Sequence, residues 1–163
     1  MELDEPDTRL LVWTTTPWTL PANLAIAVGE DIDYIKAKSA KDGQNYIVAL
    51  ALAPNIFKEG FEELERFKGS ALLGRRYEPI YVLTDYFQAL GESLSQCFKV
   101  ISAPHVTTES GTGLVHLAPA FGVEDFEACK KAGLPHFDPI DEEGKFGPLV
   151  RNVTGMNFKD ADK

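Results

Sequence analysis

The sequence predicts a mainly β domain, a closed or nearly closed β-barrel with a few flanking α-helices. Its apolar segments are short, and glycine, proline or aspartate interrupts them often, which favours many short strands over long helices. Two segments do show helical spacing, and strands with scattered helices are typical of a decorated barrel. The length of 163 residues, of which 44% are hydrophobic and 25% charged, suits one such domain.

Seven segments are predicted to be strands. Residues Asp33–Lys38 alternate between polar and apolar side chains, as a half-buried strand does. Residues Leu24–Val28 are apolar throughout, which indicates a strand buried on both faces. The predicted strands are Leu10–Thr15, Leu24–Val28, Tyr34–Lys38, Tyr46–Leu50, Ile80–Leu83, Phe98–Ser102 and Gly113–Ala118.

Two segments are predicted to be helices. The first is Asn55–Phe67, in which apolar residues recur at near-helical spacing before Gly69. The second is Val123–Ala132, which stops at Gly133. The first turn of this second helix carries acidic residues and its last turn carries lysines, and both arrangements suit the helix dipole.

The composition argues against several classes of protein. A formal net charge of -9 disfavours tight, autonomous binding of nucleic acid, because phosphate contacts need clustered lysine and arginine. If RNA is the substrate, residues outside this chain must supply much of the affinity. No apolar run approaches the ~20 residues of a membrane span, and the N-terminus does not have the pattern of a signal peptide. Cys97 and Cys129 lack the number and spacing of a disulfide framework or a metal site.

The first unusual segment is WTTTPWTLPAN, residues Trp13–Asn23. Three threonines end a predicted strand, and Pro17 then forces the chain out of it. Hydroxyls at a strand end can line a polar pocket and donate to an ester or ribose oxygen. Threonine is also a good strand former, so the triplet alone leaves a purely structural role open.

The second unusual segment is GTGLVHLAPAFG, residues Gly111–Gly122, followed by VEDF. Its glycines allow the backbone to approach a ligand closely, but the glycine patterns of phosphate-binding loops are absent. His116 lies in an apolar strand, where a histidine is commonly a satisfied core residue. Asp125 lies in a first helical turn, where an aspartate is commonly a cap. Each of these two residues therefore has a structural as well as a functional interpretation.

Together the two segments resemble the editing insertion of the class I aminoacyl-tRNA synthetases for branched aliphatic amino acids. WTTTPWTLPAN is similar to the isoleucyl-tRNA synthetase member, because the valyl and leucyl relatives carry arginine where this chain has Thr16. GTGLVHLAPAFGVEDF is similar to the second family motif, which pairs a histidine with a later aspartate, here His116 and Asp125. The resemblance implies that residues 1–163 form a single editing domain excised from a larger synthetase, with 1–8 and 159–163 as junction segments. The HIGH and KMSKS signatures of the aminoacylation site are absent, so this fragment is not expected to activate amino acids.

The resemblance implies a hydrolase that removes valine from mischarged isoleucine tRNA and spares isoleucine. Asp125 is the candidate anchor for the α-ammonium of the aminoacyl ester. Thr14, Thr15 and Thr16 are candidates to hold the ester, the ribose and an attacking water. His116 would either bound the side-chain pocket or orient or activate water. Candidates to contact the terminal adenosine and the aminoacyl group are Trp18, Gly113, Leu114, Leu117, Ala118 and Phe121.

Neither a covalent intermediate nor a cofactor is predicted. No Ser-His-Asp or Cys-His pairing is identifiable in the sequence, and no set of metal ligands is visible. The implied partners are the aminoacylated 3′ end of tRNA(Ile) and the rest of the synthetase chain. We expect a monomeric cytoplasmic domain without a membrane partner, and an organellar location stays open.

Three alternatives remain at this point. The chain could be a non-catalytic module that positions the tRNA 3′ end, a structural barrel unrelated to synthetases, or a free-standing hydrolase of small amides or esters. An inserted module must rejoin its host at one place. The insertion therefore predicts that Leu10–Trp13 and Met156–Lys159 lie in neighbouring strands or a short stalk.

Overall fold

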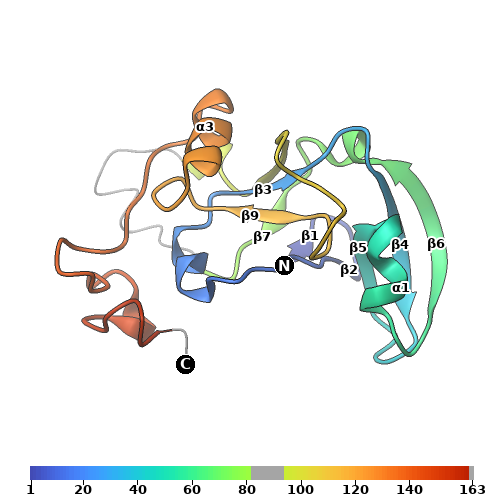
Figure 1. Cartoon of the computed structure of the whole chain (residues 1–163), viewed down its shortest axis with the longest axis horizontal. Coiled ribbons are helices and arrows are strands. Elements are labelled where there is room, and N and C mark those ends of the chain that lie inside the picture. Colours follow the sequence, from blue (N-terminus) through green and yellow to red (C-terminus); the bar gives the residue numbers. More distant parts are fainter. Residues whose placement is uncertain (82–93, 162–163) are drawn as a thin grey trace.

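Two β-sheets carry the fold of the computed structural model (Figure 1). The structure describes residues 1–81 and 94–161. The larger sheet has six strands in the order β6-β4-β5-β2-β1-β7, and the smaller has three in the order β8-β3-β9. The strands are β1 (Glu2–Leu3), β2 (Thr8–Leu10), β3 (Ala25–Val28), β4 (Asp33–Ser39), β5 (Asn45–Ala49), β6 (Phe61–Lys68), β7 (Tyr77–Glu78), β8 (Lys99–Ser102) and β9 (Val115–Leu117).

The larger sheet is built on a hairpin of β4 and β5, which pair antiparallel from Tyr34 opposite Ala49 to Lys38 opposite Asn45. Gly43, with a φ of 71°, lies in the turn between them, in the left-handed region that glycine adopts readily. Strand β5 pairs parallel with β2, and short antiparallel ladders join β2 to β1 and β1 to β7. The structure confirms the strands predicted around β4 and β5.

The edge strand β6 shows that the helix predicted at Asn55–Phe67 is wrong. Only α1 (Ala53–Ile56) is helical there, and β6 pairs antiparallel with β4 along its length. The helix ends at Ile56, where the cap residue Phe57 leaves the α region, and Gly60, with a φ of 99°, also lies outside that region. Glutamate and lysine favour helices intrinsically, but backbone pairing with β4 outweighs this weak preference.

In the smaller sheet, β3 is central and pairs parallel with β8 and antiparallel with β9. All four residues of β3 are buried, as the unbroken apolar run predicts. Helix α3 (Val123–Lys131) lies over this sheet (Figure 1) and confirms the second predicted helix. The three strands correspond to the predicted segments Leu24–Val28, Phe98–Ser102 and Gly113–Ala118.

The predicted closed or nearly closed barrel is wrong, because neither sheet closes on itself within the described residues. Two isolated β-bridges connect the sheets, Trp13 with Val115 and Arg76 with Lys99. A closed barrel would need continuous ladders of hydrogen bonds there. The strand predicted at Leu10–Thr15 ends at Leu10, so no regular ladder forms around the bridge of Trp13 with Val115. The strand predicted at Ile80–Leu83 is not seen at Ile80 and Tyr81, and its remaining residues lie outside the described residues.

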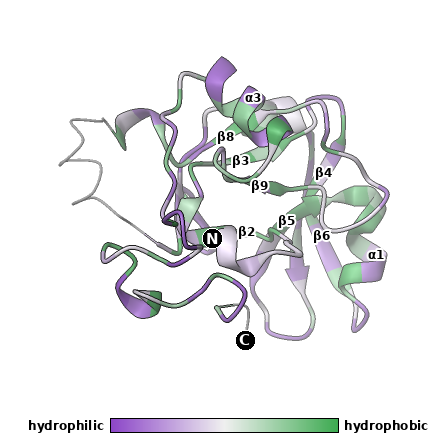
Figure 2. Cartoon of the chain, turned by 60° about the vertical axis from the view of Figure 1, so that its left-hand side comes forward, coloured by the Kyte–Doolittle hydropathy of each residue, from purple (hydrophilic) through white to green (hydrophobic). Residues whose placement is uncertain are grey.

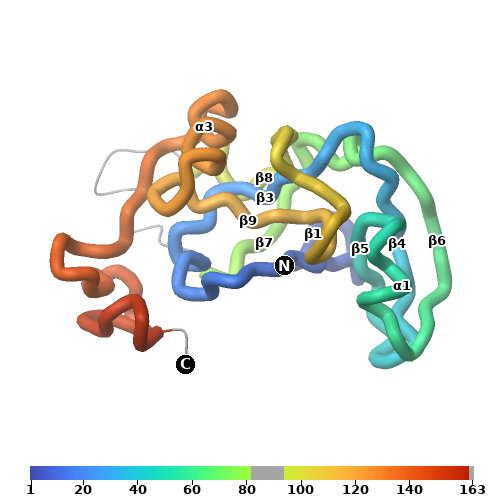
Figure 3. Tube along the Cα trace, in the orientation of Figure 1, coloured from blue at the N-terminus to red at the C-terminus, as the bar shows by residue number. Residues whose placement is uncertain are grey.

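The C-terminal residues form a lobe beside the sheets, drawn in orange to red in Figure 3. Within this lobe Asn157 bridges to Lys145, and the ring of Phe158 lies 4.7 Å from that of Trp18, centroid to centroid. The segment Met156–Lys159 therefore meets the chain at Trp18 and does not pair with Leu10–Trp13. The 3-10 helices are η1 (Pro17–Ala22), η2 (Leu50–Leu52), η3 (Gly69–Leu72), η4 (Leu94–Gln96) and η5 (Arg151–Val153).

The main core cluster joins the two sheets. Leu10 and Ile47 come from the larger sheet, and Ile26, Val28 and Val100 come from the smaller one; all five are almost fully buried. Figure 2 shows this apolar character along β3, β5 and β9. Each such side chain contributes about 1.5–3 kcal/mol on burial, so the core fixes the relative position of the two sheets.

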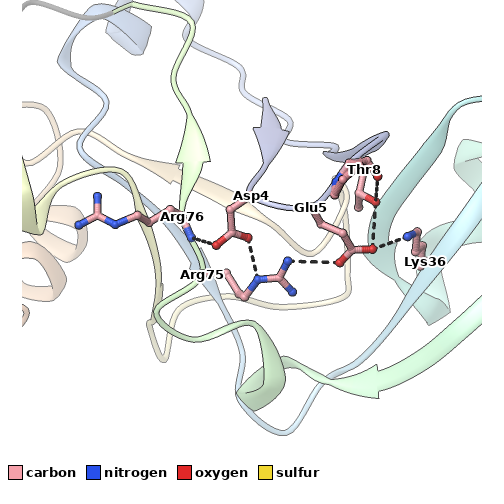
Figure 4. A network of polar contacts seen from close by, with 7 residues as sticks. Asp4, Glu5, Thr8, Lys36, Arg75 and Arg76 are labelled. Atoms are coloured by element: carbon pink, nitrogen blue, oxygen red, sulfur yellow. Dashed lines mark hydrogen bonds and ion pairs between the residues drawn. The ribbon is translucent and has the colours of Figure 1, made fainter.

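A polar network ties the turn between β1 and β2 to the rest of the larger sheet (Figure 4). Arg75 donates to Asp4 (Nε to Oδ1, 2.7 Å) and to Glu5 (Nη2 to Oε2, 3.2 Å), and the amide of Arg76 donates to Asp4. Lys36 on β4 also pairs with Glu5, and its hydrogen bond is the main cause that lowers the pKa of Glu5. The network therefore fixes the turn at Asp4 and Glu5, from which the chain continues through β2 to Trp13.

Candidate active site

A cavity of about 340 Å³ lies where two segments distant in sequence meet, residues 13–19 and residues 105–125. The first segment is blue and the second yellow to orange in Figure 3, and the bridge of Trp13 with Val115 joins them. Hydroxyl, imidazole and carboxylate side chains share the wall. The lining residues are Trp13, Thr14, Thr15, Thr16, Thr19, His105, Thr107, Ser110, Gly111, Thr112, Gly113, Leu114, Val115, His116, Ala118, Phe121 and Asp125.

The three predicted threonines form one tight turn at the edge of this cavity. Thr14 Oγ1 accepts a hydrogen bond from the amide of Thr16 (3.1 Å) and lies 3.5 Å from Thr16 Oγ1. Pro17 then begins η1, where its fixed φ suits the first helical position. Thr15 and Thr16 are exposed, so their hydroxyls are accessible to a ligand in the cavity.

The glycine-rich loop on the other side of the cavity is held by contacts to the larger sheet. Tyr34 on β4 donates its hydroxyl to the carbonyl of Gly113 (2.6 Å), and the amide of Ala49 donates to the carbonyl of Thr112 (2.9 Å). Gly113 has a φ of 78°, and a Cβ there would lie 2.3 Å from Ala49 Cβ. No larger residue fits without movement, so the sequence GTG fixes the backbone of the loop.

His116 on β9 is 7% exposed and is held through Thr19. Its Nε2 lies 2.9 Å from Thr19 Oγ1, and the Thr19 hydroxyl donates its one proton to the carbonyl of Thr16 (2.8 Å). Thr19 Oγ1 must therefore accept from His116, which assigns the proton of the neutral ring to Nε2. The other ring nitrogen, Nδ1, is buried and has no hydrogen-bond partner among the described residues.

This environment makes His116 a poor general base. Burial lowers the pKa of His116 to about 4, so the ring is neutral at neutral pH. Its Nε2 proton is directed at Thr19, and Nδ1 is shielded from solvent. A general base must come within hydrogen-bond reach of the proton that it removes. In this arrangement the ring presents a wall to the cavity and no accessible proton acceptor.

Asp125 lies in the first turn of α3 and faces back toward the loop that follows β9. Its Oδ2 accepts a hydrogen bond from the amide of Ala118 (2.9 Å), and its Oδ1 lies 4.0 Å from Nε2 of His105. Burial raises the pKa of Asp125, while the Ala118 hydrogen bond and His105 oppose that rise. The carboxylate is thus fixed on one oxygen and can accept from a ligand on the other.

Most of the residues singled out by the sequence lie around this cavity. Two of them do not line it. Leu117 points to the opposite face of β9 from His116 and is buried with Ala25 and Ala27 of β3. The ring of Trp18 lies 4.8 Å from that of Phe121, centroid to centroid, and so packs against a residue of the cavity wall. Those that line it are Thr14, Thr15, Thr16, Gly113, Leu114, His116, Ala118, Phe121 and Asp125.

The sequence interpretation missed several polar residues of the wall. Thr19 lies inside the first motif, but only the structure shows that it contacts His116. His105, Thr107 and Ser110 belong to the run HVTTES just before Gly111. The high density of polar side chains ahead of a GTG turn is the signal that could have identified them.

The described residues contain no group of three or more side chains arranged to hold a metal ion. Among the same residues, no helix has the length and apolar character needed to cross a membrane.

Relatives with similar sequences match this chain along nearly all of its length. It is 48% identical to an isoleucine–tRNA ligase of Bdellovibrio bacteriovorus, over 99% of this chain and 15% of that protein. It is 43% identical to the cytoplasmic isoleucine–tRNA ligase of Schizosaccharomyces pombe, over 99% of this chain and 16% of that protein. The chain thus spans about 15% of the length of the relatives that it matches. Comparison with protein-family models gives no match.

Solved structures place the fold. The editing domain of the P. falciparum cytosolic leucyl-tRNA synthetase aligns with a TM-score of 0.67 at 11% identity, covering 96% of this chain and 75% of that one. The corresponding P. knowlesi domain aligns with a TM-score of 0.63 at 12% identity, covering 94% of this chain and 78% of that one. Along nearly its whole length the chain is therefore similar to one segment of isoleucine–tRNA ligases, and its fold is that of the synthetase editing domains.

Proposed function

We propose that this chain is the editing domain of a longer cytoplasmic isoleucyl-tRNA synthetase and hydrolyses Val-tRNA(Ile) while sparing Ile-tRNA(Ile). The observation that carries the proposal is the single cavity that gathers the threonine turn, His116 and Asp125 from about 100 residues apart in sequence. Isoleucyl-tRNA synthetases are the standard example of the underlying problem. One methylene gives a binding pocket only about 1–3 kcal/mol of discrimination, so a second site must remove the smaller product.

Asp125 is the proposed anchor of the substrate. An aminoacyl ester carries a free α-ammonium, and a buried cation without a counter-ion is costly. The Oδ1 of Asp125 is the carboxylate oxygen left for this cation, because Oδ2 is taken by the amide of Ala118. Anchoring the ammonium fixes the ester carbonyl relative to the threonine turn.

The proposed reaction is a direct hydrolysis by water. Water adds through its oxygen to the acyl carbon, the bond from that carbon to the ribose oxygen breaks, and the proton lost by water ends on the ribose oxygen. The hydroxyls of Thr14, Thr15 and Thr16, which line the cavity, are proposed to hold water, ester and ribose together. Such positioning can supply much of the rate enhancement without a covalent intermediate. The terminal adenosine would contact Phe121 and the backbone of the glycine-rich loop.

His116 is proposed to select the substrate by size. Its ring is buried, neutral and held by Thr19, so it is a rigid boundary rather than a base. Forcing one extra methylene against a rigid wall costs about 1–3 kcal/mol. Valine then fits the side-chain pocket and isoleucine is excluded.

The test is deacylation of Val-tRNA(Ile) and Ile-tRNA(Ile) by the full-length synthetase that carries this domain. We expect hydrolysis of the valyl ester alone, and loss of that hydrolysis in Asp125→Asn. The rival function, a non-catalytic module that positions the tRNA 3′ end, predicts no difference in hydrolysis between the two proteins. Equal hydrolysis by wild type and Asp125→Asn would therefore reject the proposal.

A further inference from the structure

We propose that His105 is a positioning residue for Asp125, which holds the carboxylate in place for the α-ammonium of the substrate. The inference rests on the proposed function, because it assumes that Asp125 is the ammonium anchor. It adds a residue from outside both motifs. His105 comes from the loop after β8, and its imidazole approaches the one carboxylate oxygen that the amide of Ala118 does not occupy.

The backbone around His105 is fixed relative to α3. Residues Ala103–Val106 form a turn in which the amide of Val106 donates to the carbonyl of Ala103 (3.3 Å), with Pro104 at the second position, which proline favours. The two ends of the turn, Ala103 and Val106, are buried in one cluster with Cys129 of α3. Cys129 lies one helical turn after Asp125, so core packing sets the distance between His105 and the carboxylate.

The side chains meet in a partly closed environment. The side chain of His105 is 15% exposed and that of Asp125 is 22% exposed, and Nε2 of His105 lies 4.0 Å from Oδ1 of Asp125. His105 Nε2 is buried and has no hydrogen-bond partner among the described residues. A buried polar atom without a partner is unfavourable. A small approach of the two side chains therefore lets Nε2 donate to one lone pair of Oδ1 and leaves the other lone pair for the ammonium.

This geometry gives His105 an indirect role. Its ring borders the cavity, but Nε2 is buried, so this nitrogen acts on the substrate through Asp125. The ionisable neighbours of Asp125 include Cys129 one turn further along α3, Glu124, which raises the pKa of Asp125, and His105, which lowers it. His105 therefore favours the ionised carboxylate against the effect of burial. An oriented, ionised Asp125 is what an ammonium group requires.

The test compares His105→Phe with His105→Gln in the full-length synthetase. Phenylalanine keeps a flat ring of similar shape but removes the donor, whereas the amide of glutamine can still donate to Asp125. For Val-tRNA(Ile) deacylation we expect His105→Phe to raise KM about tenfold, the scale of a hydrogen bond to a charged group, with kcat unchanged. His105→Gln should recover most of the loss. In an Asp125→Asn background, His105→Phe should have no further effect.

The decisive control is the same tRNA carrying the α-hydroxy analogue of valine, which has no ammonium. His105→Phe should leave KM for this ester unchanged. An equal rise in KM for both esters would show that the ring only supports the fold, and an unchanged KM for Val-tRNA(Ile) would also overturn the proposal. A defective Asp125→Asn together with a normal His105→Phe refutes only the role of His105. A normal Asp125→Asn refutes the proposed function itself.

Discussion

Replacing His116 with alanine tests whether the ring is the boundary of the side-chain pocket. The change removes an imidazole from the wall of a cavity of about 340 Å³. It leaves no buried donor without a partner, because the hydroxyl of Thr19 still donates to the carbonyl of Thr16. We therefore expect the variant to fold, with a loss of about 1–2 kcal/mol in the free energy of unfolding.

The expected gain is in hydrolysis of the correct product. Isoleucine is larger than valine by one methylene, and overpacking by that group costs about 1–3 kcal/mol. Removing the wall relieves this cost, which corresponds to an increase of roughly 5- to 150-fold in kcat/KM for Ile-tRNA(Ile). Hydrolysis of Val-tRNA(Ile) should persist, because neither ring nitrogen of His116 is open to water.

The assay is deacylation of both charged tRNAs by the full-length His116→Ala synthetase, alongside its melting temperature. Loss of valyl hydrolysis without any gain on the isoleucyl ester would refute the wall and make His116 part of the hydrolytic machinery. A lower melting temperature with unchanged substrate preference would assign the ring a structural role alone.

Three further predictions concern stability. Gly113→Ala should lower the free energy of unfolding by about 2–5 kcal/mol, since it combines a strained φ of 78° with a clash on Ala49; an unshifted denaturation midpoint would show that the loop yields. The pKa of His116, about 4 in the folded chain against the ordinary 6.5, means that the unfolded chain binds the proton first. Stability should then fall by about 3 kcal/mol as the pH drops from 6.5 to about 4. Denaturant titrations of wild type and His116→Gln across this range should diverge by that amount, and parallel curves would contradict it. Arg75→Ala should cost under about 1 kcal/mol and less at high salt, because the network around it is partly exposed; a salt-independent loss would point to packing instead.

Local sequence signals predicted those elements whose conformation does not depend on a particular neighbouring strand. The apolar run of β3 and the charge pattern of α3 each matched the structure, because burial on both faces and the helix dipole act within the segment itself. The stretch Phe61–Lys68 failed for the opposite reason. Its helix-favouring residues form a strand only because β4 lies beside it, and no local pattern records that neighbour.

In the candidate site, too, the sequence indicated single residues, whereas their contacts came only from the structure. The two motifs identified Thr14–Thr16, His116 and Asp125, because resemblance to a family carries residue positions directly. The partners of these residues depend on tertiary contacts. The contacts of Thr19 with His116 and of His105 with Asp125 become visible only once β9, η1 and the loop after β8 are placed in space. Leu117 was assigned to the site with the rest of its motif, although strand alternation puts it on the face opposite His116, where it is buried in the core.

The most direct test of the proposed site is a crystal structure of the domain with a non-hydrolysable valyl-adenosine amide, which mimics the aminoacylated 3′ end. The quantity to measure is the distance from the α-nitrogen of the valyl group to Oδ1 of Asp125. We predict a hydrogen-bonded distance of about 2.7–2.9 Å, with the valine side chain against the ring of His116 and the amide carbonyl beside the threonine turn. An analogue bound with its α-nitrogen away from Asp125, or outside the cavity, would contradict the account.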